Sequence, residues 1–375
     1  MSMENGLEPK VYKEPIIEER IGMATVKVIG VGGGGCNAIA RMYHERIMGV
    51  EYLAVNTDAQ HLIQMEIPTK VRIGDKLTRG LGVGGSPEIG REAAEESRDE
   101  LYEAVREADM VFVAAGMGGG TGTGACPVVA EIARETGALT IAVVTKPFAF
   151  EGHKRRRQAE DGIQLLRDQV DSLIVIPNDR LLDMCEEDVT TDQAFKMADD
   201  VLRQGVQAIA ELVTVSGIIN LDFADVKSIM SGAGPAWMAI GSAKGENRAV
   251  EAANAAISSP MLDVSIEGAK GVLINVTGGA DLTLHEVHEA AAVIERVVDP
   301  NANIIFGMVQ DLKIEDEVKV TIIATGFPAA DALIPAEEYL FSQLEMASVN
   351  GSEDLDVPPF LRRHPSLRRR NRQTF

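Results

Sequence analysis

The sequence is poor in aromatic residues and in cysteine. Phenylalanine, tyrosine and tryptophan make up 4% of the 375 residues, whereas hydrophobic residues of all kinds make up 45%. The core must therefore be built mainly from aliphatic side chains. Three cysteines, Cys36, Cys126 and Cys185, cannot all pair with one another, and a chain of this length does not need disulfides to fold. We therefore expect a reducing compartment, the cytoplasm.

Long apolar runs are also missing. No run approaches the roughly 20 residues that cross a membrane, so we expect no direct membrane span. The N-terminus, MSMENGLEPKVYKEPIIEER, lacks the charged-then-apolar pattern of a signal peptide. The formal net charge is −21, and such an acidic body repels phosphate, which predicts no nucleic-acid partner. The basic exception is the end of the chain, where residues 361–375 carry six arginines and no acid.

Strand-like and helix-like segments alternate in the first half of the chain. Buried-strand patterns occupy residues 25–31, 51–55, 110–115, 139–145 and 172–176, and residues 86–107 are typical of a helix. This alternation predicts an α/β fold with a parallel sheet and helices on both faces. Strand patterns at 271–276 and 317–324, with helical patterns at 249–258 and 284–298, predict a smaller α+β domain.

A long helix is predicted in the middle of the chain. Apolar or small residues recur at spacings of three and four between Ala194 and Leu212, and Thr190 with Gln193 forms a possible capping box. The helix is either a spine between two domains or an ordinary core helix, and its pattern alone does not decide. We divide the chain into six parts. They are a disordered N-terminal segment (1–22), a nucleotide-binding domain (23–189), this helix (190–215), the α+β domain (216–330), a linker (331–354) and a basic C-terminal peptide (355–375).

The first glycine cluster occupies residues 30–35 (GVGGGG), between a predicted strand and a helix predicted over 37–44. Glycine lets the backbone approach a phosphate, and a helix N-terminus supplies N–H groups and a dipole. The spacing also satisfies G-x-G-x-x-G, with Asp58 as the acid that a dinucleotide-binding Rossmann domain requires. The cluster therefore indicates a phosphate ligand or a tight turn, without choosing the ligand.

A second glycine cluster follows the strand that ends at residue 115. Residues 116–124 read GMGGGTGTG and precede a helix expected to begin near Pro127. Six glycines in nine residues exceed what packing requires, so we expect backbone amides to face a ligand, with Thr121 and Thr123 adding hydroxyl donors. Two phosphate loops fit a triphosphate better than a dinucleotide. Neither a P-loop motif nor the Asn-Lys-x-Asp guanine motif is present.

These motifs resemble the tubulin/FtsZ family. GGGTGTG is similar to the signature that tubulin and FtsZ share, and the resemblance extends over residues 24–327 through VNTDAQ (55–60), TRGLG (78–82), PNDRLL (177–182), LRQGVQ (202–207) and NLDFADVK (220–227). The segment LDVPPFLRRH (355–364) resembles the C-terminal peptide of FtsZ, the bacterial tubulin-like cell-division GTPase family. The resemblance implies a Rossmann-like parallel-sheet GTPase domain, joined by a long central helix to a smaller α+β domain.

The resemblance also implies which residues bind GTP or GDP. Asp199 would read guanine with Asn178, because a carboxylate accepts from both N1–H and the exocyclic amine of guanine. Phe195 would stack on the base, Glu151 would bind the ribose, and Arg155 would reach the nucleotide. Mg²⁺ would be held mainly by phosphates and water, without a dedicated protein site. The phosphate loops would comprise Gly33, Gly34, Gly35, Cys36 and Asn37 in the first, and Gly118, Gly119, Gly120, Thr121, Gly122 and Thr123 in the second. Cys36 stands where many family members have asparagine.

The implied catalytic residues lie far from the base site along the chain. Asn220, Asp222 and Asp225 follow the long helix, at least ~30 Å from Phe195 and Asp199 if the helix rises 1.5 Å per residue. They would reach the nucleotide of a neighbouring subunit in a head-to-tail homopolymer, because a heterologous interface generates open filaments.

The resemblance further implies a filament at the division site, forming the mid-cell ring. Residues 355–364 would bind a membrane-anchoring adaptor and other division proteins. The competing interpretations are another filament protein of the tubulin superfamily and a nicotinamide-dependent oxidoreductase.

Overall fold

The structure, a computed structural model, describes residues 24–45, 47, 49–182, 189–214, 222–259, 266, 268–310, 314 and 316–327. Within these residues, ten strands form one sheet in the order β3-β2-β1-β4-β5-β6-β7-β10-β8-β9. The strands are β1 (Val26–Val31), β2 (Val50–Asn56), β3 (Thr69–Arg72), β4 (Met110–Gly116), β5 (Leu139–Lys146), β6 (Ser172–Pro177), β7 (Gly234–Lys244), β8 (Gly271–Gly278), β9 (Asn303–Gln310) and β10 (Glu317–Thr325).

The sheet changes direction partway across. Neighbouring strands are parallel from β3 to β7, β10 runs antiparallel to both β7 and β8, and β8 and β9 are parallel. The predicted α/β class and all seven predicted strands are confirmed. The sequence did not indicate β3, β7 and β9. β3 is short and polar, β7 begins with Gly-Pro, and β9 contains Gly307, so each lacks a clear strand pattern.

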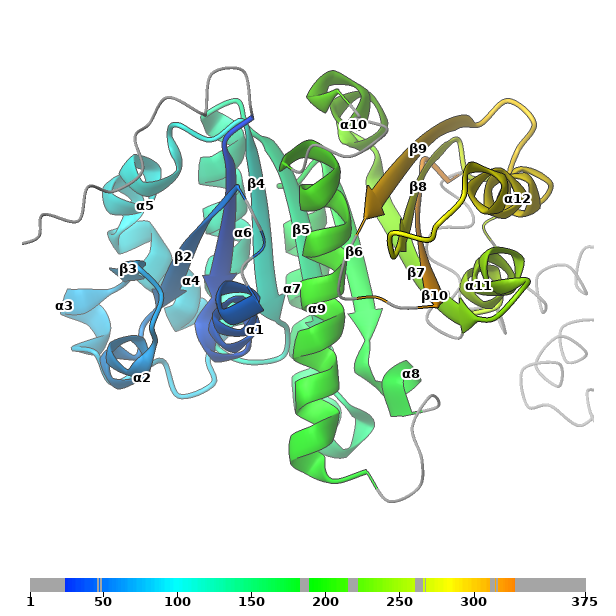
Figure 1. The fold of residues 1–375 in the computed structure, drawn as a ribbon. Coiled ribbons are helices and arrows are strands. Elements are labelled where there is room, and N and C mark those ends of the chain that lie inside the picture. Colours follow the sequence, from blue (N-terminus) through cyan, green and yellow to red (C-terminus); the bar gives the residue numbers. More distant parts are fainter. Residues whose placement is uncertain are drawn as a thin grey trace, which may run out of the picture. The chain divides into compact units, whose positions relative to one another are not determined.

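Helices cover both faces of the sheet (Figure 1). Alternate residues of β1 enter different cores: Val28 packs with α1 and α9, and Ile29 packs with α4, α5, α6 and α7. A third core joins β8 and β10 to α11 and α12. The helices are α1 (Gly32–Glu45), α2 (Ala59–Gln64), α3 (Asp75–Thr78), α4 (Pro87–Glu96), α5 (Arg98–Val105), α6 (Thr121–Glu135), α7 (His153–Arg167), α8 (Asn178–Leu182), α9 (Thr191–Thr214), α10 (Phe223–Met230), α11 (Arg248–Ile257) and α12 (Leu284–Glu295), with a 3₁₀ turn at Ala149–Glu151.

The long helix predicted in the middle of the chain is α9. Its capping box is confirmed, because Thr190 N donates to Gln193 Oε1 over 2.8 Å and Gln193 N donates to Thr190 Oγ1 over 3.3 Å. The helix contacts α1 and β5 from the first part of the chain and β9 from the last part. No helix within the described residues is long and apolar enough to cross a membrane.

Three predicted helix boundaries are wrong. The helix predicted over 86–107 is broken at Ser97 into α4 and α5, where Ser97 Oγ accepts from Gly74 N over 3.1 Å. Helix α1 begins at Gly32 instead of Asn37, and α6 begins at Thr121 instead of near Pro127. Both glycine clusters therefore extend into the first turns of helices, and this places their backbone N–H groups at helix N-termini.

Candidate functional site

The two glycine clusters meet at the carboxyl ends of β1 and β4. These strands are parallel neighbours with Val31 opposite Ala115, and each runs directly into a glycine cluster. Gly32 has φ +71°, and a Cβ on it would lie 2.6 Å from Gly122 N. Only glycine fits this contact, so the N-termini of α1 and α6 lie side by side.

A cavity of 490 Å³ lies against this junction. At Gly33 and Gly119 an added Cβ would meet no atom within 4 Å, so the backbone there borders open space. Helix N-termini present N–H donors and a positive dipole end, which suits an anion. The cavity is lined by Gly33, Gly34, Asn56, Thr57, Asp58, His61, Leu81, Gly82, Val83, Gly84, Gly85, Gly116, Gly119, Gly120, Thr121 and Gly122.

Part of the second glycine cluster serves packing. An added Cβ would lie 2.3 Å from Val83 Cγ2 at Gly120, 2.7 Å from Gly116 O at Gly122, and 1.9 Å from Pro87 O at Gly124. The expectation that these glycines exceed what packing requires is therefore wrong for these three positions. They let the start of α6 approach the loop before α4, the end of β4 and the first residue of α4 closely.

The two threonines of the second cluster hold loops in place. Thr121 Oγ1 lies 2.7 Å from Thr57 Oγ1, which joins the second glycine cluster to the segment after β2. Thr123 Oγ1 accepts from Gly118 N over 2.8 Å and so closes the turn before α6. Of the two, only Thr121 lines the 490 Å³ cavity.

The side chain of Cys36 points into the core. Its Sγ lies 3.3 Å from Gly30 O and 3.6 Å from Val55 O, so its one hydrogen can be donated to either oxygen, and the residue is fully buried. Burial raises the pKa of this thiol to about 12, so the thiol stays protonated. The side chain of Cys36 is therefore not placed to serve a ligand, and Cys36 is not among the residues that line the cavity. Gly35 also lies behind the cavity wall, since a Cβ on it would be 2.1 Å from Ala114 O.

An aromatic cluster lies at the N-terminal end of α9. Phe195 is 41% exposed, and its ring makes edge contacts with Phe148 and Phe150 at centroid distances of 5.5 and 6.3 Å. Phe148 and Phe150 stack at 5.0 Å. The exposed part of the Phe195 ring is thus available to a planar group.

Asp199 lies one helical turn after Phe195 and pairs with a residue that the sequence did not single out. Arg41 Nε, from α1, is 3.1 Å from Asp199 Oδ2. Burial raises the pKa of Asp199 to about 6, although Arg41 opposes the shift. Arg41 follows the first glycine cluster on α1 without belonging to any recognisable motif, so no local signal identifies it.

Asn178 is the clearest sign of a missing hydrogen-bond donor. The residue is 4% exposed at the start of α8, and its Oδ1 is buried without a partner. An unsatisfied buried polar atom is costly, which points to a donor supplied by a ligand. The other predicted pair is mutually satisfied, because Arg155 Nη1 lies 2.5 Å from Glu151 Oε2. The side chains of Asn178, Glu151, Arg155 and Phe195 do not line the 490 Å³ cavity itself.

The predicted catalytic residues are at the other end of α9 in the sequence. Asn220 lies outside the described residues. Asp222 is the N-cap of α10, where its Oδ1 accepts from Ala224 N over 3.2 Å, and Asp225 lies in the first turn of that helix. Neither aspartate lines the cavity, so the structure does not bring them together with the phosphate loops.

Residues missed by the sequence analysis complete the cavity. Asn56, His61 and the loop 81–85 line it, and they lie in or beside the VNTDAQ and TRGLG motifs. Asp58 also lines it, but its Oδ1 caps α2 by accepting from Gln60 N and His61 N over 2.9 and 3.1 Å. Its use as a cap argues against the ribose-binding role that a dinucleotide fold would give it.

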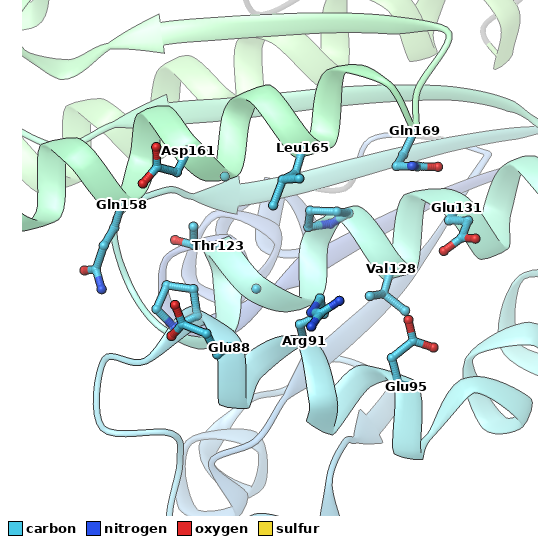
Figure 2. Close-up of a pocket in the computed structure, with 14 residues that line it drawn as sticks. Glu88, Arg91, Glu95, Thr123, Val128, Glu131, Gln158, Asp161, Leu165 and Gln169 are labelled. Carbon is cyan, nitrogen blue, oxygen red and sulfur yellow. The ribbon is translucent and has the colours of Figure 1, made fainter.

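A second cavity of 340 Å³ lies between α4, α6 and α7 (Figure 2). It borders the second glycine cluster at Thr123 and Gly124. Its lining contains four carboxylates and one arginine, which Figure 2 labels: Glu88, Glu95, Glu131, Asp161 and Arg91. Its lining does not reach the N-terminus of α1, so it lacks the paired helix N-termini of the first cavity.

Comparisons with known proteins agree with this geometry. Residues 25–186 match the model of the tubulin/FtsZ family GTPase domain, and residues 234–328 match that of the FtsZ family C-terminal domain. A solved empty FtsZ dimer from M. jannaschii is 48% identical, with 82% of this chain and 89% of that chain covered and a TM-score of 0.80. The GDP-bound CetZ1 monomer from Haloferax volcanii shares the fold at 23% identity, with 86% and 99% covered and a TM-score of 0.71. The GTPγS-bound CetZ2 protofilament from the same organism also shares the fold. Its identity to this chain is 19%, with 87% of this chain and 98% of that chain covered and a TM-score of 0.70.

Proposed function

The chain belongs to the tubulin/FtsZ family of GTPases, and from this premise we propose that it is a polymerising cytoskeletal GTPase that hydrolyses GTP between subunits stacked head to tail. The observation that carries the proposal is the meeting of two glycine-lined helix N-termini, of α1 and α6, at one 490 Å³ cavity. Two N-terminal N–H clusters fit the consecutive phosphates of a nucleoside triphosphate.

The base of the nucleotide would lie toward α9. Asp199 would accept from N1–H and the exocyclic amine of guanine, and the unsatisfied Oδ1 of Asn178 would gain a donor. Phe195 would stack on the base with its exposed face. Glu151 and Arg155 would have to exchange part of their mutual ion pair for contacts with the ribose and the nucleotide.

Magnesium would be bound mainly through the nucleotide. Among the described residues no group of three or more histidine, cysteine, aspartate or glutamate side chains is placed to hold a metal ion. The cavity lining supplies one carboxylate, that of Asp58, and Mg²⁺ usually keeps several waters while it binds phosphates and one or two carboxylates. The lining therefore fits an ion held by phosphate oxygens and water, and the ion would neutralise charge on the phosphates.

Hydrolysis would need a second subunit. Asp222 and Asp225 lie at the start of α10 and outside the cavity lining, so a neighbouring subunit would supply them together with Asn220. A carboxylate there would orient and deprotonate the attacking water. The dimer and protofilament among the similar structures support self-association of this kind.

We also propose a role at the division site. The 48% identity to an FtsZ, against 23% and 19% to the two CetZ proteins, favours the cell-division branch of the family over another filament protein. Residues 355–364 lie outside the described residues, and we propose that they bind a membrane-anchoring adaptor. Removing residues 355–375 should spare GTP hydrolysis and filament formation and abolish adaptor binding in a pull-down. Loss of GTPase activity would contradict a separable tail.

The deciding experiment measures light scattering and phosphate release with GTP and with ATP over a range of protein concentrations. We expect scattering with GTP only, and a specific activity that rises once filaments form. A specific activity independent of protein concentration would contradict hydrolysis between subunits. Binding of NAD(H) in preference to GTP would support the oxidoreductase interpretation instead.

A further inference from the structure

His61 lies between two asparagines at the edge of the nucleotide cavity. Its Nδ1 is 3.0 Å from Asn56 Nδ2, and its Nε2 is 2.9 Å from Asn37 Oδ1. Asn56 is the last residue of β2, and Asn37 lies on α1 after the first glycine cluster. The imidazole lines the cavity and connects the end of β2 to Asn37, which follows the lining residues Gly33 and Gly34 on α1 without being a lining residue itself.

The orientation of the Asn56 amide is fixed by the backbone. Its Oδ1 accepts from Thr57 N over 2.9 Å and from Asp58 N over 3.3 Å. A backbone N–H can only donate, so the atom facing both groups must be the amide oxygen. Asn56 is 3% exposed, and a flipped amide would leave two backbone donors facing an NH₂ group. Asn56 Nδ2 therefore donates toward His61.

This donor determines the tautomer of His61. Nδ1 must accept from Asn56, and a neutral imidazole has one accepting and one donating nitrogen. The proton is therefore on Nε2, which donates to Asn37 Oδ1. The same reasoning fixes the orientation of the Asn37 amide. Two donors cannot face each other, so the amide oxygen of Asn37, and not its NH₂ group, faces the protonated Nε2.

We propose that His61, in its Nε2-protonated neutral form, is a positioning residue that holds Asn37 with its amide oxygen turned away and its N–H donors free for a nucleotide phosphate. The inference rests on the proposed function of the cavity. A phosphate accepts hydrogen bonds and repels an amide oxygen. The orientation of the Asn37 amide therefore decides whether its contact with a phosphate is attractive or repulsive. Asn37 is an exposed residue, and without His61 no other described contact would prevent its amide from turning.

Three substitutions at His61 distinguish the hydrogen bonds that its ring makes from the space that its ring fills. In His61→Gln, the side-chain amide can accept from Asn56 and donate to Asn37, so GTP affinity should stay within about twofold of the parent. His61→Asn can replace only Nδ1, and His61→Ala replaces neither nitrogen. Both should weaken GTP binding by about three- to tenfold, below the full worth of a hydrogen bond to a charged group. GTP titration of the full chain gives the dissociation constants, and melting temperatures show whether each variant is folded.

A double-mutant cycle tests whether His61 acts through Asn37. Asn37→Ala should weaken GTP binding, and adding His61→Ala to it should cause no further loss. His285→Ala, an exposed histidine on α12, is the matched control and should match the parent. A direct readout is the imidazole ¹⁵N spectrum of the parent, in which Nδ1 of His61 should be the unprotonated nitrogen.

The outcomes distinguish this inference from the proposed function. If the parent does not bind GTP, the proposed function fails. If the parent binds GTP but His61→Asn binds as well as His61→Gln, or the losses at positions 37 and 61 simply add, the positioning role is overturned. A protonated Nδ1 in the spectrum would overturn it as well.

Discussion

Arg41 Nε lies 3.1 Å from Asp199 Oδ2, and this ion pair joins α1, which begins in the first glycine cluster, to α9, which carries the residues proposed to bind the base. Because Asp199 is largely buried, the pair is shielded from solvent on its acidic side. The ion pair thus connects the two ends of the proposed nucleotide site, and a second pair between the same helices, Arg203 with Glu45 at 3.0 Å, lies farther along them.

The guanine assignment is tested by Asp199→Asn. The amide cannot accept from both guanine donors, so GTP binding should weaken by about 1.5–3 kcal/mol, the worth of a hydrogen bond to a charged group. Preference for GTP over ATP should fall in parallel. Asp192→Asn, on the exposed side of the same helix, is the matched control and should bind as the parent does. Unchanged GTP affinity in Asp199→Asn would contradict the assignment.

The same carboxyl predicts a pH dependence of nucleotide binding. Burial raises the pKa of Asp199 to about 6, and guanine should bind only the ionised form. Lowering the pH from 7.5 to 5.5 should therefore weaken GTP binding about fourfold through this group. Titration of the nucleotide phosphates is common to parent and variant, so the difference between the parent and Asp199→Asn isolates the effect. Equal pH profiles for the two proteins would contradict it.

The raised pKa also predicts the direction of a stability change. A folded-state pKa above the unfolded value near 4 means that the native protein holds a proton that the unfolded chain has lost. This contribution to the free energy of unfolding is present below about pH 4 and is lost as the pH rises through about 6. In the absence of nucleotide, the stability of Asp199→Asn relative to the parent should therefore rise over that window. Urea unfolding at pH 4.5 and 7.5 measures the difference, and a constant difference would contradict it.

The sequence predicts the parallel sheet, the long helix and the phosphate loops because each depends on a local pattern. Periodicity identifies β1 and α9, and clustered glycine identifies the two segments that meet at Gly32 and Gly122. The contacts of Arg41 and His61 are long-range, and no local pattern encodes them. Gly124 shows a different limit, since the same residue type serves ligand approach and helix packing, and only the 1.9 Å distance from its hypothetical Cβ to Pro87 O separates the two.

That distinction between glycines is testable. Gly124→Ala should lower the free energy of unfolding by about 3 kcal/mol, at the upper end of the range for overpacking, because its Cβ meets backbone. Gly119→Ala meets no atom within 4 Å and should change stability by less than about 1 kcal/mol, while its methyl group obstructs a phosphate. Urea unfolding without nucleotide and GTP titration measure the two effects. Equal destabilisation by both substitutions would contradict the division into packing and ligand-facing glycines.

Catalysis between subunits gives the sharpest prediction. Asp225→Asn should leave GTP affinity intact, because Asp225 does not line the cavity of its own subunit. Turnover should fall by at least ~10²-fold, the usual worth of a positioned general base. Asp222→Asn tests the second aspartate more cleanly than Asp222→Ala, because asparagine preserves the N-cap that Asp222 provides to α10.

A mixture of two defective variants separates catalysis between subunits from catalysis within one. At a GTP concentration that saturates Asp225→Asn and leaves Asp199→Asn largely empty, each variant alone should be nearly inactive. In an equal mixture, about a quarter of head-to-tail interfaces combine a GTP-loaded Asp225→Asn subunit with the intact Asp225 of an Asp199→Asn neighbour. Phosphate release should therefore recover toward a quarter of the parent rate. If both halves of the site belonged to one subunit, every subunit in the mixture would lack one of them, and mixing would restore nothing.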